Sequence, residues 1–255
     1  MDAWKYQPAK DLSLPPMERW RSVRRESGLV EDLTHGAWWA LARLYLKVLH
    51  RLKVEGRENL PENPPFVMVA NHSSHLDALA LAAALPRRLR QAALPVAAGD
   101  FFFEAPAMAA FAAYCLNALP LWRKRAGRHA MDELRRRLVD EPCGFILFPE
   151  GTRSRTGEMS PFKPGLGMIV AGTPAPVIPC HIAGAHEAWP ADRRRPRVKP
   201  VRVRIGLPLR FQNVSNDRDG WERVARETED AVRRLGGLPR REPPPAAGRP
   251  AESSL

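Results

Sequence analysis

Residues 65–77 read PFVMVANHSSHLD, an apolar run that passes into a polar segment. A short apolar run bounded by turn-forming residues is typical of a buried strand. We therefore predict a strand over Pro65–Ala70, then a loop, then a helix that begins near Ser74. In this arrangement His72 lies in the loop and Asp77 lies in the first turn of the helix.

Three other segments resemble this strand. Gly144–Phe148 and Pro176–Pro179 are continuous apolar runs, whereas Val201–Ile205 alternates apolar with basic residues. Strict alternation is typical of a strand with one exposed face. The chain thus contains four candidate strands, of which Val201–Ile205 is expected to be half exposed.

Helical patterns separate and follow these strands. One covers His129–Val139, and another follows Ser215 or Asn216, either of which can cap a helix. Its apolar face is expected to hold Trp221, Val224, Thr228, Ala231 and Leu235. Strands interleaved with helices predict an α/β domain. We expect a mixed, largely parallel central sheet flanked by helices.

An amphipathic helix is predicted over Gly36–Val54. Its apolar stripe is expected to comprise Trp38, Leu41, Tyr45, Val48 and Leu49, opposite Arg43, Lys47 and Arg51. Such a stripe packs on a protein core or inserts into a membrane surface, where tryptophan, tyrosine and basic residues are favoured. Both interpretations fit the sequence.

The segment Phe101–Trp122 carries a single charge, at Glu104. Its length matches the roughly 20 apolar residues of a membrane span. Pro106 and Pro120 interrupt it, however, and many of its residues are alanine. We expect a buried helix or one apposed to a membrane.

These patterns divide the chain into three parts. Residues 1–54 form an N-terminal arm and the amphipathic, membrane-facing helix, and residues 55–236 form the main domain. Residues 237–255 include three consecutive prolines and few large apolar groups, so we expect a disordered tail.

Charge and cysteine content narrow the class of protein. The chain has 255 residues and a formal net charge of +12, which favours nucleic acid, anionic lipid headgroups or phosphorylated substrates as partners. Its 3 cysteines show no paired spacing and therefore predict neither a disulfide framework nor a zinc cluster. The N-terminus lacks the pattern of a signal peptide, so an intracellular location is expected.

His72 and Asp77 are the first candidate catalytic pair. Five helical steps of about 100° would place them on opposite sides of one helix, so His72 must precede the helix for the two to meet. An ionised Asp77 would fix the imidazole tautomer and leave its other nitrogen able to accept a proton. The alternative is a simple capping hydrogen bond. For His75 we expect a surface role.

No GxSxG nucleophile motif occurs in the chain, so the attacking hydroxyl is expected to belong to a substrate. A second candidate site, FPEGTRS at 148–154, follows a buried strand, where ligands of α/β sheets collect. Gly151 allows close approach of a ligand, while Thr152 and Arg153 offer donors to a phosphate. Glu150 could hold Arg153 or a substrate hydroxyl, and Lys163 adds a cation. The alternative is a tight turn with a surface salt bridge.

Arg123 follows the apolar segment within PLWRKR at 120–125. It is a candidate phosphate ligand, although a solvated basic turn is the commoner reason for such a string. The arginine runs lack interleaved aromatic residues, which single-stranded nucleic acid would favour.

Taken together, the ordered strings NHSSHLD, PLWR, FPEGTRS and PVIP resemble those of the glycerolipid acyltransferase family over residues 55–212. The resemblance implies that His72 is a general base and Asp77 its partner. It also implies that Arg123 and Arg153 contact phosphate, with Glu150, Gly151 and Thr152 completing the acceptor site. The last string matches a block associated with the acyl donor.

The resemblance thus implies transfer of an acyl group from a thioester to the hydroxyl of a lysophosphatidic acid-type lipid. Acyl-CoA or acyl carrier protein would be a co-substrate, with no metal or other cofactor. We expect peripheral or monotopic attachment to the cytoplasmic side of a membrane, and no nucleic acid partner. Two alternatives are another acceptor, such as a lyso-ornithine lipid, and a non-catalytic basic binding module. The module would leave NHSSHLD and FPEGTRS unexplained.

Overall fold

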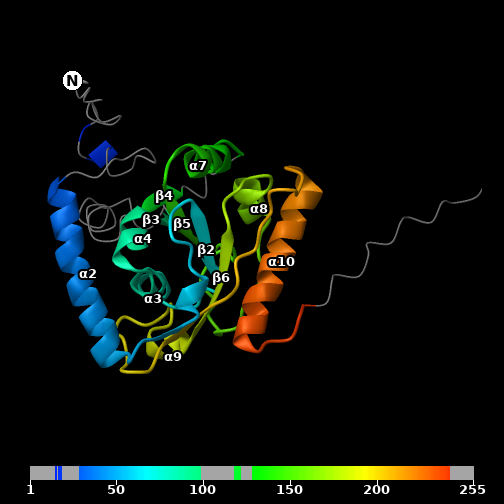
Figure 1. Ribbon diagram of the computed structural model, residues 1–255. Coiled ribbons are helices and arrows are strands. Elements are labelled where there is room, and N and C mark those ends of the chain that lie inside the picture. Colours follow the sequence, from blue (N-terminus) through cyan, green and yellow to red (C-terminus); the bar gives the residue numbers. More distant parts are fainter. Residues whose placement is uncertain (1–14, 16, 19–28, 99–117, 122–127, 242–255) are drawn as a thin grey trace, which may run out of the picture.

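The computed structural model describes residues 15, 17–18, 29–98, 118–121 and 128–241. These form a sheet between two layers of helices (Figure 1). The strands are β1 (Lys53–Glu55), β2 (Phe66–Ala70), β3 (Ala93–Ala98), β4 (Leu119–Leu121), β5 (Gly144–Leu147), β6 (Val177–Ala183) and β7 (Arg202–Ile205). The helices are α2 (Leu29–Leu49), α3 (Asp77–Ala84), α4 (Arg87–Ala92), α7 (Arg128–Asp140), α8 (Gly165–Val170), α9 (Ala185–Ala188) and α10 (Arg218–Gly236), with a 3-10 turn, η1, at Arg57–Asn59.

The sheet has the strand order β1-β7-β6-β2-β5-β3-β4, with β2 in the middle. Val67 of β2 pairs with Phe145 of β5 on one side and with Val177 of β6 on the other, both in parallel register. Only the β6–β7 pair is antiparallel among the described strands. The predicted mixed, largely parallel sheet is confirmed.

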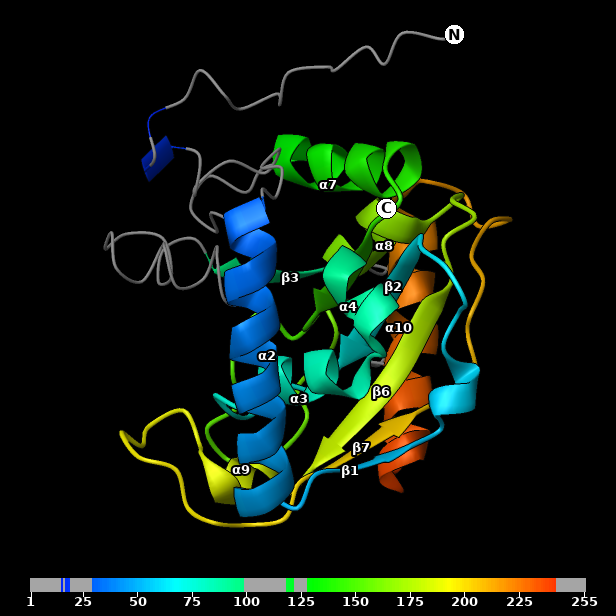
Figure 2. The same ribbon diagram turned by 60° about the vertical axis from the view of Figure 1, so that its left-hand side comes forward.

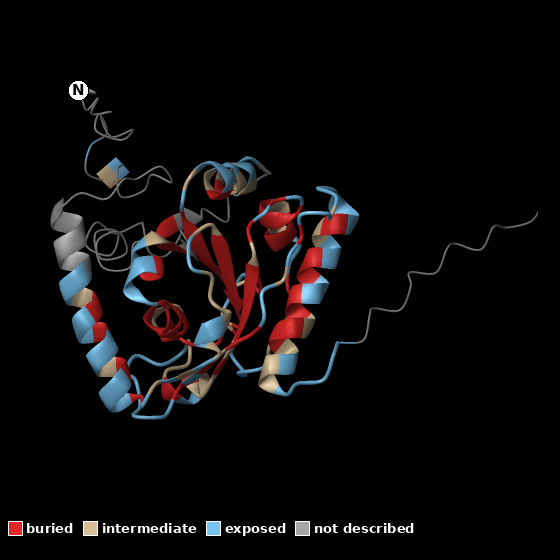
Figure 3. Ribbon diagram, in the orientation of Figure 1, coloured by how far each residue is buried: buried red, intermediate tan, exposed pale blue. Residues whose placement is uncertain are grey.

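Alternate residues of β2 enter two separate cores, because successive side chains of a strand point to opposite faces. Met68 packs in the core formed with α2, α3 and α4, whereas Val67 and Val69 pack against α7, α8 and α10. All five residues of β2 are buried, as Figure 3 shows. A strand covered on both faces is continuously apolar, which explains the run at 66–70.

The other strand and helix predictions are largely confirmed. β5 and β7 match their predicted positions, and β6 continues beyond Pro179 to Ala183. α7 covers the helix expected at 129–139, and α10 buries Val224, Thr228 and Ala231 as expected. The N-cap of α10 is Asp217, whose carboxylate accepts a hydrogen bond from Gly220 N–H, so the predicted caps at Ser215 and Asn216 were wrong.

The predicted apolar stripe of the N-terminal helix was only partly right: Trp38 and Tyr45 pack against the core, but the most buried residues were not in it. α2 buries Trp39, Ala42 and Leu46 against the core, while Leu41 and Val48 of the predicted stripe are exposed. The buried stripe thus combines large Trp39 and Leu46 with small Ala42. The helix also ends at Leu49 rather than at Val54: Arg51 adopts a left-handed conformation (φ 43°), and the chain enters β1.

The helix expected over Phe101–Trp122 falls mostly on residues 99–117 and 122, outside the described part. Its end does not form a helix, because Leu119–Leu121 is the parallel edge strand β4, paired with β3. Pro120 lacks an N–H group, and an edge strand tolerates that absence. Most of the predicted N-terminal arm and of the tail, at 242–255, likewise lies outside the described residues.

Figure 2 shows α2 running along one side of the molecule, with its C-terminal end near the segment that joins α9 to β7. His50, just after α2, ties these parts together: its Nδ1 lies 3.0 Å from the Lys199 carbonyl oxygen. Among the residues that the structure describes, no helix has both the length and the apolar character needed to cross a bilayer.

Candidate active site

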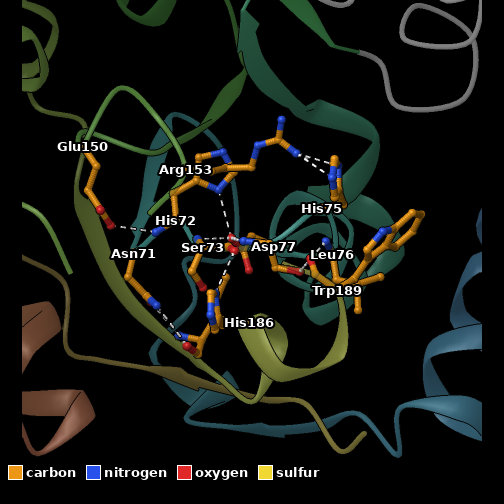
Figure 4. Close-up of polar contacts among 12 residues, drawn as sticks. Asn71, His72, Ser73, His75, Leu76, Asp77, Glu150, Arg153, His186 and Trp189 are labelled. Atoms are coloured by element: carbon orange, nitrogen blue, oxygen red, sulfur yellow. Dashed lines mark hydrogen bonds and ion pairs between the residues drawn. The ribbon is translucent and has the colours of Figure 1, made fainter. Parts of the chain in front are cut away.

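His72 and Asp77 meet at the C-terminal end of the central strand. β2 ends at Ala70, His72 lies in the following loop, and Asp77 is the first residue of α3. His72 Nδ1 is 2.9 Å from Asp77 Oδ2 (Figure 4). A carboxylate only accepts hydrogen bonds, so the contact places the imidazole proton on Nδ1 and leaves Nε2 as an acceptor. The predicted placement of both residues is confirmed, although α3 begins three residues later than Ser74.

Asp77 is fully buried and contacts both the His72 ring and the backbone of the loop before α3. Its Oδ2 accepts the backbone N–H groups of Ser73 and Ser74, each at 2.7 Å, besides facing His72. Its Oδ1 has no hydrogen-bond partner. These contacts fix the carboxylate at the start of α3, facing the His72 ring.

The His72 ring is held but not sealed. It stacks on Phe148, with ring centroids 4.1 Å apart and an angle of 19° between planes, and its side chain is 21% exposed. Phe148 follows β5, so the neighbouring strand supplies the support. The ring is therefore fixed at the edge of the sheet and still accessible from solvent.

Glu150 is a buried carboxylate that holds the main chain. Its Oε1 accepts the N–H of His72 at 2.7 Å, and its Oε2 accepts the N–H of Ser160 at 2.9 Å. Burial raises the pKa of Glu150, while the two backbone donors act in the opposite direction. The sequence suggested that Glu150 binds Arg153 or a substrate hydroxyl; here its oxygens join two loops.

The turn after Glu150 places backbone and cations at the same edge. Gly151 has a φ of +75°, a left-handed conformation that favours glycine, and a Cβ added there would lie 2.7 Å from Lys163 Nζ. The Lys163 side chain thus lies over the turn, and the backbone N–H of Lys163 donates to the Pro149 carbonyl at 3.0 Å. Ser154 N–H donates to the His72 carbonyl at 2.8 Å, which ties this turn to the loop after β2.

Arg153 contacts the half-buried His75. Arg153 Nη1 lies 2.5 Å from His75 Nδ1, and His75 Nε2 lies 3.3 Å from the Ala191 carbonyl oxygen (Figure 4). The ring also packs near Trp189, with centroids 5.0 Å apart. Burial, then the Arg153 charge, lowers the pKa of His75, so the neutral ring accepts from the guanidinium. The surface role expected for His75 was wrong.

Asn71 and Ser160 complete the framework and were missed in the sequence. The Asn71 amide donates to the Ile182 carbonyl at 3.0 Å and accepts the Ile182 N–H at 2.8 Å, which fastens the loop to β6. Asn71 directly follows a predicted strand, a position that could have indicated this role. Ser160 contributes only its backbone, which no side-chain pattern reveals.

The structure brings most of the proposed site residues to one edge of the sheet: His72, Asp77, Glu150, Gly151, Thr152, Arg153 and Lys163. Thr152 is exposed on the turn. Arg123 lies outside the described residues. Within the described ranges, no three His, Cys, Asp or Glu side chains gather as metal ligands would.

This geometry comes from the segment that matches a family model described as Acyltransferase, over residues 51–183. The match covers more than half of the chain. The chain belongs to the acyltransferase family. The resemblance seen in the sequence is thereby confirmed.

Two relatives share the name 1-acyl-sn-glycerol-3-phosphate acyltransferase. The chain is 28% identical over 181 residues to 1-acyl-sn-glycerol-3-phosphate acyltransferase alpha of Homo sapiens, across 69% of this chain and 62% of the relative. It is 35% identical over 97 residues to the 1-acyl-sn-glycerol-3-phosphate acyltransferase of Cocos nucifera, across 38% of this chain and 29% of that protein. The chain thus spans about three fifths of the human protein.

A solved structure shares the fold of this acyltransferase. It is the 1-acyl-sn-glycerophosphate (LPA) acyltransferase PlsC from Thermotoga maritima, with a TM-score of 0.64 and 25% sequence identity. The likeness covers 81% of this chain and 80% of that chain. It therefore extends beyond the residues that the family model matches.

Proposed function

We propose that this protein transfers an acyl group from an acyl thioester to the free hydroxyl of a lysophosphatidic acid. The observation that carries the proposal is the pair of His72 and Asp77, with 2.9 Å between Nδ1 and Oδ2 and an accessible ring at the end of β2. The names of the relatives favour a phosphorylated acceptor. Acyl-CoA or acyl carrier protein would supply the acyl group.

In this mechanism His72 Nε2 removes the proton of the acceptor hydroxyl as its oxygen attacks the thioester carbonyl. The new C–O bond gives a tetrahedral oxyanion. Its collapse breaks the C–S bond, and the thiolate leaves with the proton that His72 holds. Asp77 stabilises the imidazolium formed between these steps. No covalent enzyme intermediate is needed.

The acceptor phosphate would bind at the turn after β5. Arg153 and Lys163 bring positive charge there, Thr152 adds a hydroxyl, and Gly151 leaves room for the Lys163 side chain over the turn. Holding the phosphate beside His72 turns a chance encounter of the hydroxyl with the base into an oriented attack. Arg123 is proposed as a further phosphate contact on the strength of the sequence resemblance.

Membrane attachment is proposed through α2. Leu41, Leu44 and Val48 lie at successive turns of this helix, and their exposed fractions are 64%, 58% and 61%. This apolar stripe keeps Leu41 and Val48 of the predicted one and adds Leu44, and it suits the interface of a bilayer on its cytoplasmic side. Lys47, also exposed, would face the anionic headgroups.

The test is incubation of the purified protein with radiolabelled acyl-CoA or acyl carrier protein thioester and a panel of lyso-lipids. The expected product is phosphatidic acid from lysophosphatidic acid. Arg153→Ala should reduce use of this acceptor much more than use of a lyso-lipid without phosphate. Acylation of lyso-ornithine lipid alone, or of no lipid in the panel, would contradict the proposal.

A further inference from the structure

α10, which lies outside the residues that match the family model, is bonded to the loop that carries Lys163. Glu229 is on the buried face of α10 and is only 5% exposed. Its Oε2 accepts the Phe162 N–H at 3.0 Å, and its Oε1 accepts from Arg233 Nε at 2.8 Å. Arg233 Nη2 in turn donates to the Met159 carbonyl at 3.2 Å.

The same loop is held on its other side by the active site. Ser160 N–H donates to Glu150 at 2.9 Å, and Lys163 N–H donates to the Pro149 carbonyl at 3.0 Å. The segment 159–163 is therefore fixed at four successive points between α10 and the loop after β5. Glu150 also bonds the N–H of His72, so the series of contacts from α10 ends at the base.

The position of Lys163 depends on this fixed segment. Lys163 is exposed, and a long flexible side chain on a loose loop would spread its charge over a wide volume. Here its ammonium group lies over Gly151, next to the turn that carries Arg153. The preceding residue, Phe162, is buried, and its N–H bonds to Glu229. These contacts restrict the backbone position of Lys163.

We propose that Glu229, supported by Arg233, is a positioning residue for the acceptor phosphate: it fixes the segment 159–163 so that Lys163 stands over the Gly151 turn. The inference rests on the proposed function, because it takes the phosphate of the acceptor to bind there. Glu229 does not contact the reacting atoms, so its loss acts through the loop.

α10 also provides a matched control. Arg223 and Glu227 form an ion pair of the same spacing on the same helix, with 2.7 Å between Nε and Oε1. Both side chains are well exposed, and this pair does not bond to the loop. Exposed pairs of this kind contribute little to stability. Glu227→Ala therefore removes a helix ion pair without touching the site.

Steady-state kinetics of three variants tests the proposal. Glu229→Ala removes the acceptor of the Phe162 N–H and should raise the KM for lysophosphatidic acid about ten-fold, the effect of losing one hydrogen bond to a charged group. The KM for acyl-CoA should stay within about two-fold. Glu229→Gln loses the same charge but keeps an oxygen for Phe162, so it should restore most of the acceptor KM. Glu227→Ala should match the wild type.

Amide hydrogen exchange gives a readout independent of activity. The Phe162 amide should exchange faster in Glu229→Ala than in Glu229→Gln or Glu227→Ala. If Glu229→Ala does not fold, Arg233→Met is the second variant: it frees the Met159 carbonyl and Glu229 Oε1 but leaves the bond from the Phe162 N–H to Glu229 Oε2. It should raise the acceptor KM by a smaller factor, about three-fold.

Two results would overturn the proposal: equal losses for acceptor and donor in both Glu229 variants, or unchanged exchange at Phe162. A wild type that acylates no lysophosphatidic acid would instead refute the proposed function, and the exchange measurement would still decide whether Glu229 holds the loop.

Discussion

Two buried carboxylates, Asp77 at the start of α3 and Glu150 in the loop after β5, hold the same histidine in different ways. Asp77 faces the His72 ring and the N–H groups of its own loop, whereas Glu150 accepts the backbone N–H of His72 from the neighbouring loop. One carboxylate therefore bears on the protonation of the ring, and the other on its position. Mutation of Asp77 should therefore lower mainly kcat, whereas mutation of Glu150 should lower mainly stability.

The largest effect is expected from removal of the base itself. His72→Ala should lower kcat by about 10²- to 10⁴-fold, the typical contribution of general-base catalysis. The ring lies at the edge of the sheet, 21% exposed, so thermal unfolding should change little. His129→Ala, at an exposed histidine of α7, is the control. A kcat close to that of the wild type would rule out His72 as the base.

Asp77→Asn should come next. The amide oxygen can still accept from the loop, but a neutral amide cannot stabilise the imidazolium and permits the wrong tautomer, so we expect kcat to fall by about 10²-fold or more. The acceptor KM should change far less. If the acceptor KM rises while kcat is unchanged, Asp77 acts by shaping the loop. Its role would then not differ from that of Glu150.

Glu150→Gln should reduce stability more than it reduces kcat. Glutamine offers one oxygen where His72 and Ser160 each need an acceptor, and an unsatisfied buried N–H costs about 1–3 kcal/mol of stability. The change should appear as a lower midpoint of chemical unfolding, with kcat reduced by less than about ten-fold. A loss of kcat as large as that of Asp77→Asn, at unchanged stability, would instead give Glu150 a direct chemical role.

The smallest effect concerns pH and the contact of Arg153 with His75. Because the pKa of His75 is lowered from 6.5, its ring is neutral at pH 7 and accepts from Arg153. Protonation well below pH 6.5 would place two positive charges in contact, although Asp77 nearby opposes this. The acceptor KM should therefore be flat from neutral pH down to about 6.5 and rise at lower pH.

His75→Gln cannot be protonated and still offers an oxygen to Arg153. Its acceptor KM, measured across the same pH range, should lose the rise at low pH. An identical rise of the acceptor KM in the variant would show that a group other than His75 causes it.

Much of the fold follows from the sequence because the central strands are covered on both faces. The continuous runs at Phe66–Ala70 and Gly144–Leu147 are what such burial requires. β1, β3 and β4 were missed, because β1 has three residues and β3 is rich in alanine, which has little preference for strands. The buried side of α2 was only partly predicted, because apolar residues occur around much of this helix and the sequence does not show which of them meet the core.

In the site, contacts within one segment could be predicted from the sequence, whereas contacts between distant segments could not. The pairing of His72 with Asp77 could be predicted, since both residues lie in one short segment between a strand and a helix. The contacts of Glu150 could not, because its partners are backbone N–H groups from two other segments. Nor could those of Glu229, whose hydrogen bond to Phe162 spans 67 positions of the chain.

The central place of β2 has a consequence for inactivation by heat. Strands deep within a sheet are usually the last to open, whereas edges and loops open with small free energies. His72 is attached directly to the innermost strand of seven, with neighbours on both sides. The anchor of His72 on the sheet should therefore survive fraying of the edge strands.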